Sequence, residues 1–156
     1  MTRLTLADTL VIPDAQDAVA VPVLYNASSY DRQRANTEVT ALASAARTAT
    51  VNSADLTNYN ARGVLVTLNV SAVTATPALT LSIEAKMGAV YEALLTATTA
   101  VTATGIHSYL VYPGVGAASG DVVQVAGFPL PRTWRVTVTH GDTDSATYTV
   151  SASLIL

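Results

Sequence analysis

Strict alternation of apolar and polar residues near the end of the chain is the feature that most constrains its fold. The apolar set consists of Ala146, Tyr148, Val150, Ala152 and Leu154, with a threonine or serine between each pair. Successive side chains of a β-strand point to opposite faces, so this segment predicts a strand with one buried face and one wet face. A helix repeats every 3.6 residues and does not produce this pattern.

The same period of two recurs along most of the chain after residue 61. Turn signals interrupt it at Thr76-Pro77, Met87-Gly88, Thr104-Gly105, Pro113-Gly114, Gly120-Asp121 and His140-Gly141-Asp142. The predicted strands are 47–52, 62–71, 78–87, 90–98, 106–112, 122–126, 133–140 and 145–155. Residues 37–46 fit a helix or a leading strand, and we favour the strand. We therefore expect an all-β fold: an antiparallel two-sheet sandwich, jelly-roll-like, with about eight strands and an extended N-terminal arm.

The first 36 residues have a different character from the rest. Their apolar residues come in short clusters: Leu4, Leu6, Leu10, Val11, Ile12, Val19, Val21, Val23 and Leu24. Pro13 and Pro22 interrupt these clusters, and proline cannot donate to a sheet ladder, so a central strand is disfavoured. Residues 26–36 are polar and suit a spacer. We expect an arm at 1–36 and a sandwich domain at 37–156, with the apolar clusters as an interface on either their own sandwich or a neighbouring subunit.

The composition of the chain argues against several classes of binding partner and site. Only 12% of residues are charged and the net charge is −3, so the general attraction that drives binding to nucleic acids or anionic membranes is absent. There is no cysteine, which removes disulfides, thiolate nucleophiles and cysteine-based zinc sites. The chain shows neither the pattern of a secretory signal nor an apolar run of about 20 residues, so we expect no membrane partner.

The residues able to do chemistry do not form a recognisable set. Neither His107 nor His140 is followed by a second ligand at metal-binding spacing, and no Gly-x-Ser-x-Gly motif is present. Asp142 and Asp144 have the alternate spacing of calcium loops, but such turns more often close a hairpin, with the carboxylates bonded to the backbone. We expect no catalytic residue, no metal and no cofactor, and hence no enzyme.

Two carboxylates raise the separate question of glycoside hydrolysis. Glu84 and Glu92 fall on positions predicted to face solvent in two different strands. Nothing in the sequence enforces the separation that a pair of catalytic carboxylates needs. We therefore do not assign them a catalytic role.

The single tryptophan, Trp134, shares its strand parity with Val136 and Val138. An indole in such a position is best interpreted as part of the core between the sheets, and a sugar-stacking platform is the functional alternative. We assign to the core Trp134, Val136 and Val138 together with Tyr148 and Val150 of the last strand.

Two segments resemble a known family. Residues 58–64 read Asn-Tyr-Asn-Ala-Arg-Gly-Val and lead into a valine-rich strand, and residues 129–136 read Pro-Leu-Pro-Arg-Thr-Trp-Arg-Val and continue to His140-Gly141-Asp142. In order and spacing they are similar to head decoration, or cement, proteins of tailed bacteriophages, which are small β-sandwich virion proteins. The resemblance covers residues 48–156 and excludes the arm.

The resemblance implies a non-enzymatic structural protein on the outside of the virion capsid. It implies synthesis in the host cytoplasm, a homo-oligomer that is commonly a trimer, and stabilisation of the shell by binding the major capsid protein. A charge-poor chain with an apolar arm agrees with such a role, because many weak contacts in a symmetric assembly add up. A phage tail or fibre component and a carbohydrate-binding surface adhesin module are the alternatives.

Overall fold

The computed structural model describes residues 23–25, 30–32 and 36–156, and the chain divides into two units, Met1–Gln33 and Arg34–Leu156. In the first unit, β1 (Val23–Tyr25) pairs with β2 (Tyr30–Arg32) as an antiparallel hairpin. The strand β2 lies inside the segment 26–36, and the role of that segment as a spacer stays a prediction. The boundary expected after residue 36 stays a prediction.

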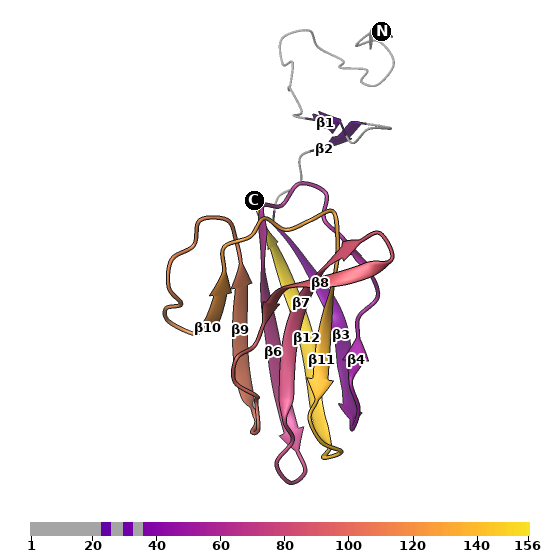
Figure 1. The fold of residues 1–156 in the computed structure, drawn as a ribbon, viewed down its shortest axis with the longest axis vertical. Coiled ribbons are helices and arrows are strands. Elements are labelled where there is room, and N and C mark those ends of the chain that lie inside the picture. Colours follow the sequence, from indigo (N-terminus) through magenta and orange to yellow (C-terminus); the bar gives the residue numbers. More distant parts are fainter. Residues whose placement is uncertain (1–22, 26–29, 33–35) are drawn as a thin grey trace, which may run out of the picture. The chain divides into compact units, whose positions relative to one another are not determined.

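The second unit consists of strands joined by turns and loops, as Figure 1 shows. Its strands are β3 (Thr37–Arg47), β4 (Val51–Asn52), β5 (Leu56–Thr57), β6 (Gly63–Val73), β7 (Leu79–Met87), β8 (Val90–Thr96), β9 (Gly105–Val111), β10 (Val122–Ala126), β11 (Thr133–His140) and β12 (Ala146–Ile155). The described part of the chain contains no helix that is long and apolar enough to cross a membrane.

The ten strands form two sheets that pack into a sandwich. One sheet has the order β10-β9-β6-β12-β3, and the other has the order β4-β11-β7-β8, with β5 also paired to β11. When β4 and β5 are counted as one strand and β10 is set aside, the eight remaining positions have the orders 1-8-3-6 and 2-7-4-5. Those orders arise from two Greek keys and define a jelly roll, so the expected fold class is confirmed.

The core lies between the sheets and uses the faces that the alternation predicts. Val64, Val66 and Leu68 of β6 are fully buried, and so are Leu81 and Ile83 of β7. The largest fully buried side chains are those of Trp134, Tyr109 and Tyr148. Burial of this much apolar surface between two pleated layers is the main contribution that stabilises such a sandwich.

The observed strands settle the ambiguous segment 37–46 and differ from the prediction at β4, β5 and β10. Residues 37–47 form the long edge strand β3, which agrees with the interpretation that we favoured. Residues 47–52, expected as one strand, hold only the two-residue β4, and the short strand β5 was not predicted. The strand β10 pairs with β9 in parallel, which is the one exception to antiparallel pairing among the described strands.

Candidate functional site

Two loops that are far apart in the sequence meet at the end of the sandwich where β12 finishes. The backbone N–H of Asn58 donates to the carbonyl of Arg132 at 2.8 Å, and the N–H of Leu130 donates to the carbonyl of Arg62 at 2.9 Å. The side chain of Asn58, which is only 6% exposed, donates to the carbonyls of Ala61 and Leu130 and accepts from the N–H of Ala61. Because this buried amide is satisfied on both of its polar atoms, the two loops are held rigidly.

Each of these loops carries an arginine stacked on a tyrosine. The guanidinium carbon of Arg132 lies 5.0 Å from the centre of the Tyr59 ring, and that of Arg62 lies 5.6 Å from the centre of the Tyr112 ring. The Tyr112 hydroxyl donates in turn to the carbonyl of the last residue, Leu156, at 3.2 Å. We call this surface the arginine–tyrosine end and define it as residues 58–62, Tyr112, 128–132 and Leu156.

Neither arginine of this end has a carboxylate partner within the described part of the chain. The ion pairs found there are Lys86 with Asp55 and Arg135 with Glu84, both elsewhere. Arg62 and Arg132 are exposed, and apolar groups are exposed beside them in sequence or space: Tyr59 is 44% exposed, Phe128 55% and Leu156 39%. An arginine-rich, aromatic surface of this kind has the composition of a protein interface.

A cavity of about 190 Å³ opens beside the arginine–tyrosine end, between the ends of the two sheets. Its lining includes the apolar and aromatic residues Val39, Leu56, Tyr59, Ala61, Trp134, Leu154 and Leu156, together with Glu38 and the polar residues Thr37, Thr57, Asn58 and Asn60. The Nε1 atom of Trp134 is buried and has no hydrogen-bond acceptor among the described residues. An unpaired buried donor costs stability, on the order of 1–3 kcal/mol.

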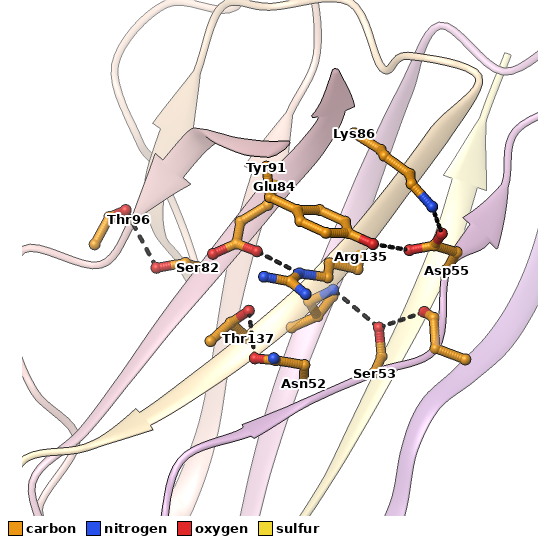
Figure 2. Close-up of polar contacts among 12 residues, drawn as sticks. Asn52, Ser53, Asp55, Ser82, Glu84, Lys86, Tyr91, Thr96, Arg135 and Thr137 are labelled. Atoms are coloured by element: carbon orange, nitrogen blue, oxygen red, sulfur yellow. Dashed lines mark hydrogen bonds and ion pairs between the residues drawn. The ribbon is translucent and has the colours of Figure 1, made fainter. Parts of the chain in front are cut away.

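A second group of polar residues covers the outer face of the β4-β11-β7-β8 sheet (Figure 2). Nε of Arg135 donates to Oε2 of Glu84 at 2.6 Å, and its guanidinium lies 3.4 Å from the centre of the Tyr91 ring. The Tyr91 hydroxyl donates to Asp55 at 2.7 Å, and Lys86 also donates to Asp55. These contacts join β7, β8 and β11 to the segment before β5, which makes them a clamp across the sheet.

The charges of this clamp satisfy one another. The hydrogen bond from Lys86, and after it the one from Tyr91, lowers the pKa of Asp55, and the same contact with Asp55 raises the pKa of Lys86. Glu84 lies on the outer face as predicted, but its side chain is only 17% exposed because Arg135 and Tyr91 cover it. Groups that bind each other in this way favour a structural role over proton transfer.

His140 and the aspartates of the last turn are engaged in structural contacts. His140 Nε2 lies 3.2 Å from the Tyr148 hydroxyl, and its buried Nδ1 has no hydrogen-bond partner among the described residues. Asp142 accepts from the N–H of Asp144, and Asp144 accepts from the N–H of Thr76. The described residues include no group of three or more side chains suited to hold a metal ion.

The residues assigned to the core all lie there. Trp134, Val136, Val138, Tyr148 and Val150 have no exposed surface, so Trp134 offers no platform for a sugar. Of the residues assigned to the arm interface, Leu4, Leu6, Leu10, Val11, Ile12, Val19 and Val21 lie outside the described residues. Val23 and Leu24 lie in β1, where only the backbone is described.

The arginine–tyrosine end was not predicted as a site. Tyr59, Arg62 and Arg132 stand in the two segments that carry the family resemblance, but nothing local in the sequence indicates that those segments meet. Tyr112 and the cavity gave no signal at all. The available clue was an arginine in each segment and a tyrosine in the first, in a chain with only 12% charged and 6% aromatic residues.

A scan against protein-family models, a search of curated proteins and a search of solved structures found no match to this chain.

Proposed function

We propose that this chain is a non-enzymatic virion structural protein that decorates and stabilises the outside of a bacteriophage capsid by binding the major capsid protein. The observation that carries the proposal is the meeting of residues 58–62 with residues 128–132. Residues 58–62 belong to the first segment that resembles decoration proteins, 58–64, and residues 129–132 belong to the second, 129–136. Together they build one exposed surface. If this surface binds a partner, one function accounts for both segments, whereas a separate local function for each segment would not explain why they meet.

The chemistry of that surface supports a protein partner. Arginine and tyrosine are enriched at protein interfaces, where they combine a broad apolar contact with a polar end. Arg62 and Arg132 present their charge from stacked, ordered positions, so binding an acidic partner costs little further side-chain entropy. The rigid Asn58 network beneath them keeps the surface preformed.

The sandwich itself suits a decoration role for a second reason. In the clamp on the outer face of the β4-β11-β7-β8 sheet, the charged side chains of Glu84, Lys86 and Arg135 form ion pairs within the protein. Attachment at many equivalent sites on a symmetric shell then multiplies a modest affinity per subunit, and a homotrimer would place three such ends on one axis.

The test is location and copy number. Mass spectrometry of purified full and empty capsids should find the protein in both, at a number of copies comparable with that of the major capsid protein. A copy number that is a small fraction of the capsid protein, with the protein in separated tails, would instead assign it to the tail. Complete absence from virions would refute the proposal.

The contact surface is tested with the full-length protein and purified undecorated shells. Arg62→Gln with Arg132→Gln should weaken co-sedimentation with shells about tenfold or more, because two stacked charged contacts are lost. Glu92→Gln is the matched control, since Glu92 is exposed on β8 and is not part of the arginine–tyrosine end. Equal binding by the double variant and the control would exclude this end as the contact surface.

A further inference from the structure

The cavity beside the arginine–tyrosine end has the size of a side-chain pocket. At about 190 Å³ it corresponds to about six water molecules of roughly 30 Å³ each, which is below the range of roughly 300–1,000 Å³ typical of cofactor sites. Leu56, Leu154 and Val39 give it apolar walls, and Glu38 also lines it. A pocket of this size and character fits one or two aliphatic side chains of a protein segment.

The surroundings of the cavity add a requirement for negative charge. Tyr59 lines the cavity and carries the stacked Arg132, while Leu156 lines it and accepts the hydrogen bond of Tyr112, on which Arg62 is stacked. Both guanidinium groups are therefore tied to the cavity through their tyrosines. Since neither has a carboxylate partner among the described residues, the fitting occupant has aliphatic side chains flanked by acidic ones.

The chain itself contains one such segment. Residues 8–14 read Asp-Thr-Leu-Val-Ile-Pro-Asp, with aliphatic residues at 10–12 between Asp8 and Asp14. Pro13 disfavours regular strand or helix pairing of this segment and leaves it suited to bind in an extended form. The described sandwich begins at Asn36, whose Oδ1 accepts from the N–H of Leu156 at 3.1 Å, so the chain enters the sandwich at the cavity end.

We propose that the cavity and the arginines beside it bind residues 8–14 of a second copy of this chain. Leu10 or Ile12 fills the cavity, and Asp8 and Asp14 pair with Arg62 and Arg132. Because the arm joins the sandwich at the same end that holds the cavity, copies arranged around an axis exchange arms reciprocally, which closes a ring. The inference rests on the proposed function in assuming that the protein works as a homo-oligomer, and it assigns Arg62 and Arg132 to a contact between copies. If it holds, the weaker shell binding of Arg62→Gln with Arg132→Gln is accompanied by loss of self-association, whereas a direct contact of these arginines with the capsid protein leaves self-association intact.

The test is an exchange of charges between full-length variants, followed by sedimentation velocity. The first variant is Asp8→Arg with Asp14→Arg, and the second is Arg62→Glu with Arg132→Glu. Each variant alone brings like charges together and should self-associate at least about tenfold more weakly than the natural chain. A chain that carries all four changes should assemble again. An equimolar mixture of the two variants should assemble into mixed pairs or other rings of even number, because an odd-numbered ring would place two copies of one variant side by side.

The results of this test distinguish an arm that docks on a second copy from one that docks on its own sandwich. If the four-change chain assembles but the mixture does not, the arm docks on its own sandwich and the inference is wrong. If either double variant assembles like the natural chain, or if the natural chain is monomeric throughout, the inference is also wrong. Glu92→Arg is the matched control for a reversed charge elsewhere, and the emission of Trp134 together with the melting temperature checks that each variant is folded.

Shell binding distinguishes this inference from the proposed function. A natural chain that decorates purified shells while the mixture of variants fails to assemble refutes arm exchange and leaves the proposed function intact. A mixture that assembles as expected, from a protein that is absent from virions and binds no shells, supports arm exchange and refutes the proposed function.

Discussion

The guanidinium carbon of Arg47, at the end of β3, lies 4.6 Å from the centre of the Tyr148 ring on the neighbouring strand β12. The same guanidinium donates to the carbonyls of Ala43 and Tyr148 at 2.7 and 2.9 Å, and to that of Ala45 at 3.2 Å. The pairing of β3 with β12 is irregular here, because its register shifts between Tyr148 and Val150. Arg47 thus supplies hydrogen bonds where the ladder is interrupted.

Removal of this contact should loosen the edge of the sandwich. Arg47→Ala is expected to lower the free energy of unfolding by about 1–2 kcal/mol, from lost charge-assisted hydrogen bonds and lost packing on Tyr148. Urea denaturation followed by tryptophan fluorescence measures the change. Arg132→Ala, which removes an exposed arginine that also stacks on a tyrosine, should cost less than Arg47→Ala. Equal losses in the two variants would show that the hydrogen bonds from Arg47 to the carbonyls of Ala43, Ala45 and Tyr148 add no stability of their own.

The pH dependence of stability should report on His140. Burial lowers the pKa of His140 below its ordinary value of 6.5, and Arg47 acts in the same direction against the opposing effect of Asp142. The unfolded chain therefore binds this proton more readily than the folded chain. The contribution to stability is fully present above pH 6.5 and is lost as the pH falls through 6.5 towards the lowered pKa of the folded state.

Denaturation curves measured at a series of pH values between about 8 and 5.5 test this direction. The natural chain should become less stable across the interval, and His140→Gln should flatten the dependence. His107→Gln, which removes the other histidine, is the matched control and should keep the slope. A stability that rises as the pH falls would contradict the predicted direction.

Two substitutions of the buried Trp134 distinguish the effect of lost side-chain volume from the effect of its unpaired N–H. Trp134→Ala should lower the free energy of unfolding by about 3–5 kcal/mol, because it leaves a large void between the sheets. Trp134→Phe should cost clearly less, since it keeps an aromatic ring in place and removes the N–H that has no acceptor. Thermal melts of both variants give the comparison, and a natural chain whose emission matched that of free tryptophan would contradict the burial.

The faces of the long strands could be predicted from sequence because each face is set by its own alternation. Val64, Val66 and Leu68 share one face of β6, so they are buried together once that face packs against a core, whichever strands β6 pairs with. The parts that were missed depend on partners distant in sequence. Asn58 finds Leu130 across 72 positions, and Glu84 is covered because it lies opposite Arg135 on β11. Local patterns do not encode such register and loop contacts, and for that reason the arginine–tyrosine end emerged only from the structure.

Gly63 is a further residue whose role depends on a contact distant in sequence and could not be predicted. The sequence gives no reason for a glycine at the start of β6, but a β-carbon there would collide with the carbonyl oxygen of Val111 and lie 2.9 Å from Cα of Tyr112. Gly63→Ala should therefore destabilise the protein by about 1–3 kcal/mol through forced displacement of backbone. Gly116→Ala, where an added β-carbon meets nothing within 4 Å, should be close to neutral in the same thermal melts.

Deletion of the arm tests its role in assembly directly. Burying even about 500 Å² of apolar arm surface is worth on the order of 10 kcal/mol, but fixing the backbone costs about 1–2 kcal/mol for each residue ordered, which consumes most of that gain. A single arm should therefore attach weakly, and a closed ring of arms should hold firmly. Removal of the residues before Thr37 is expected to leave the β-sheet circular dichroism spectrum unchanged while it abolishes or greatly weakens self-association and shell binding. Unfolding of the shortened chain would assign the arm to its own core, and undiminished assembly would show that the arm has no part in it.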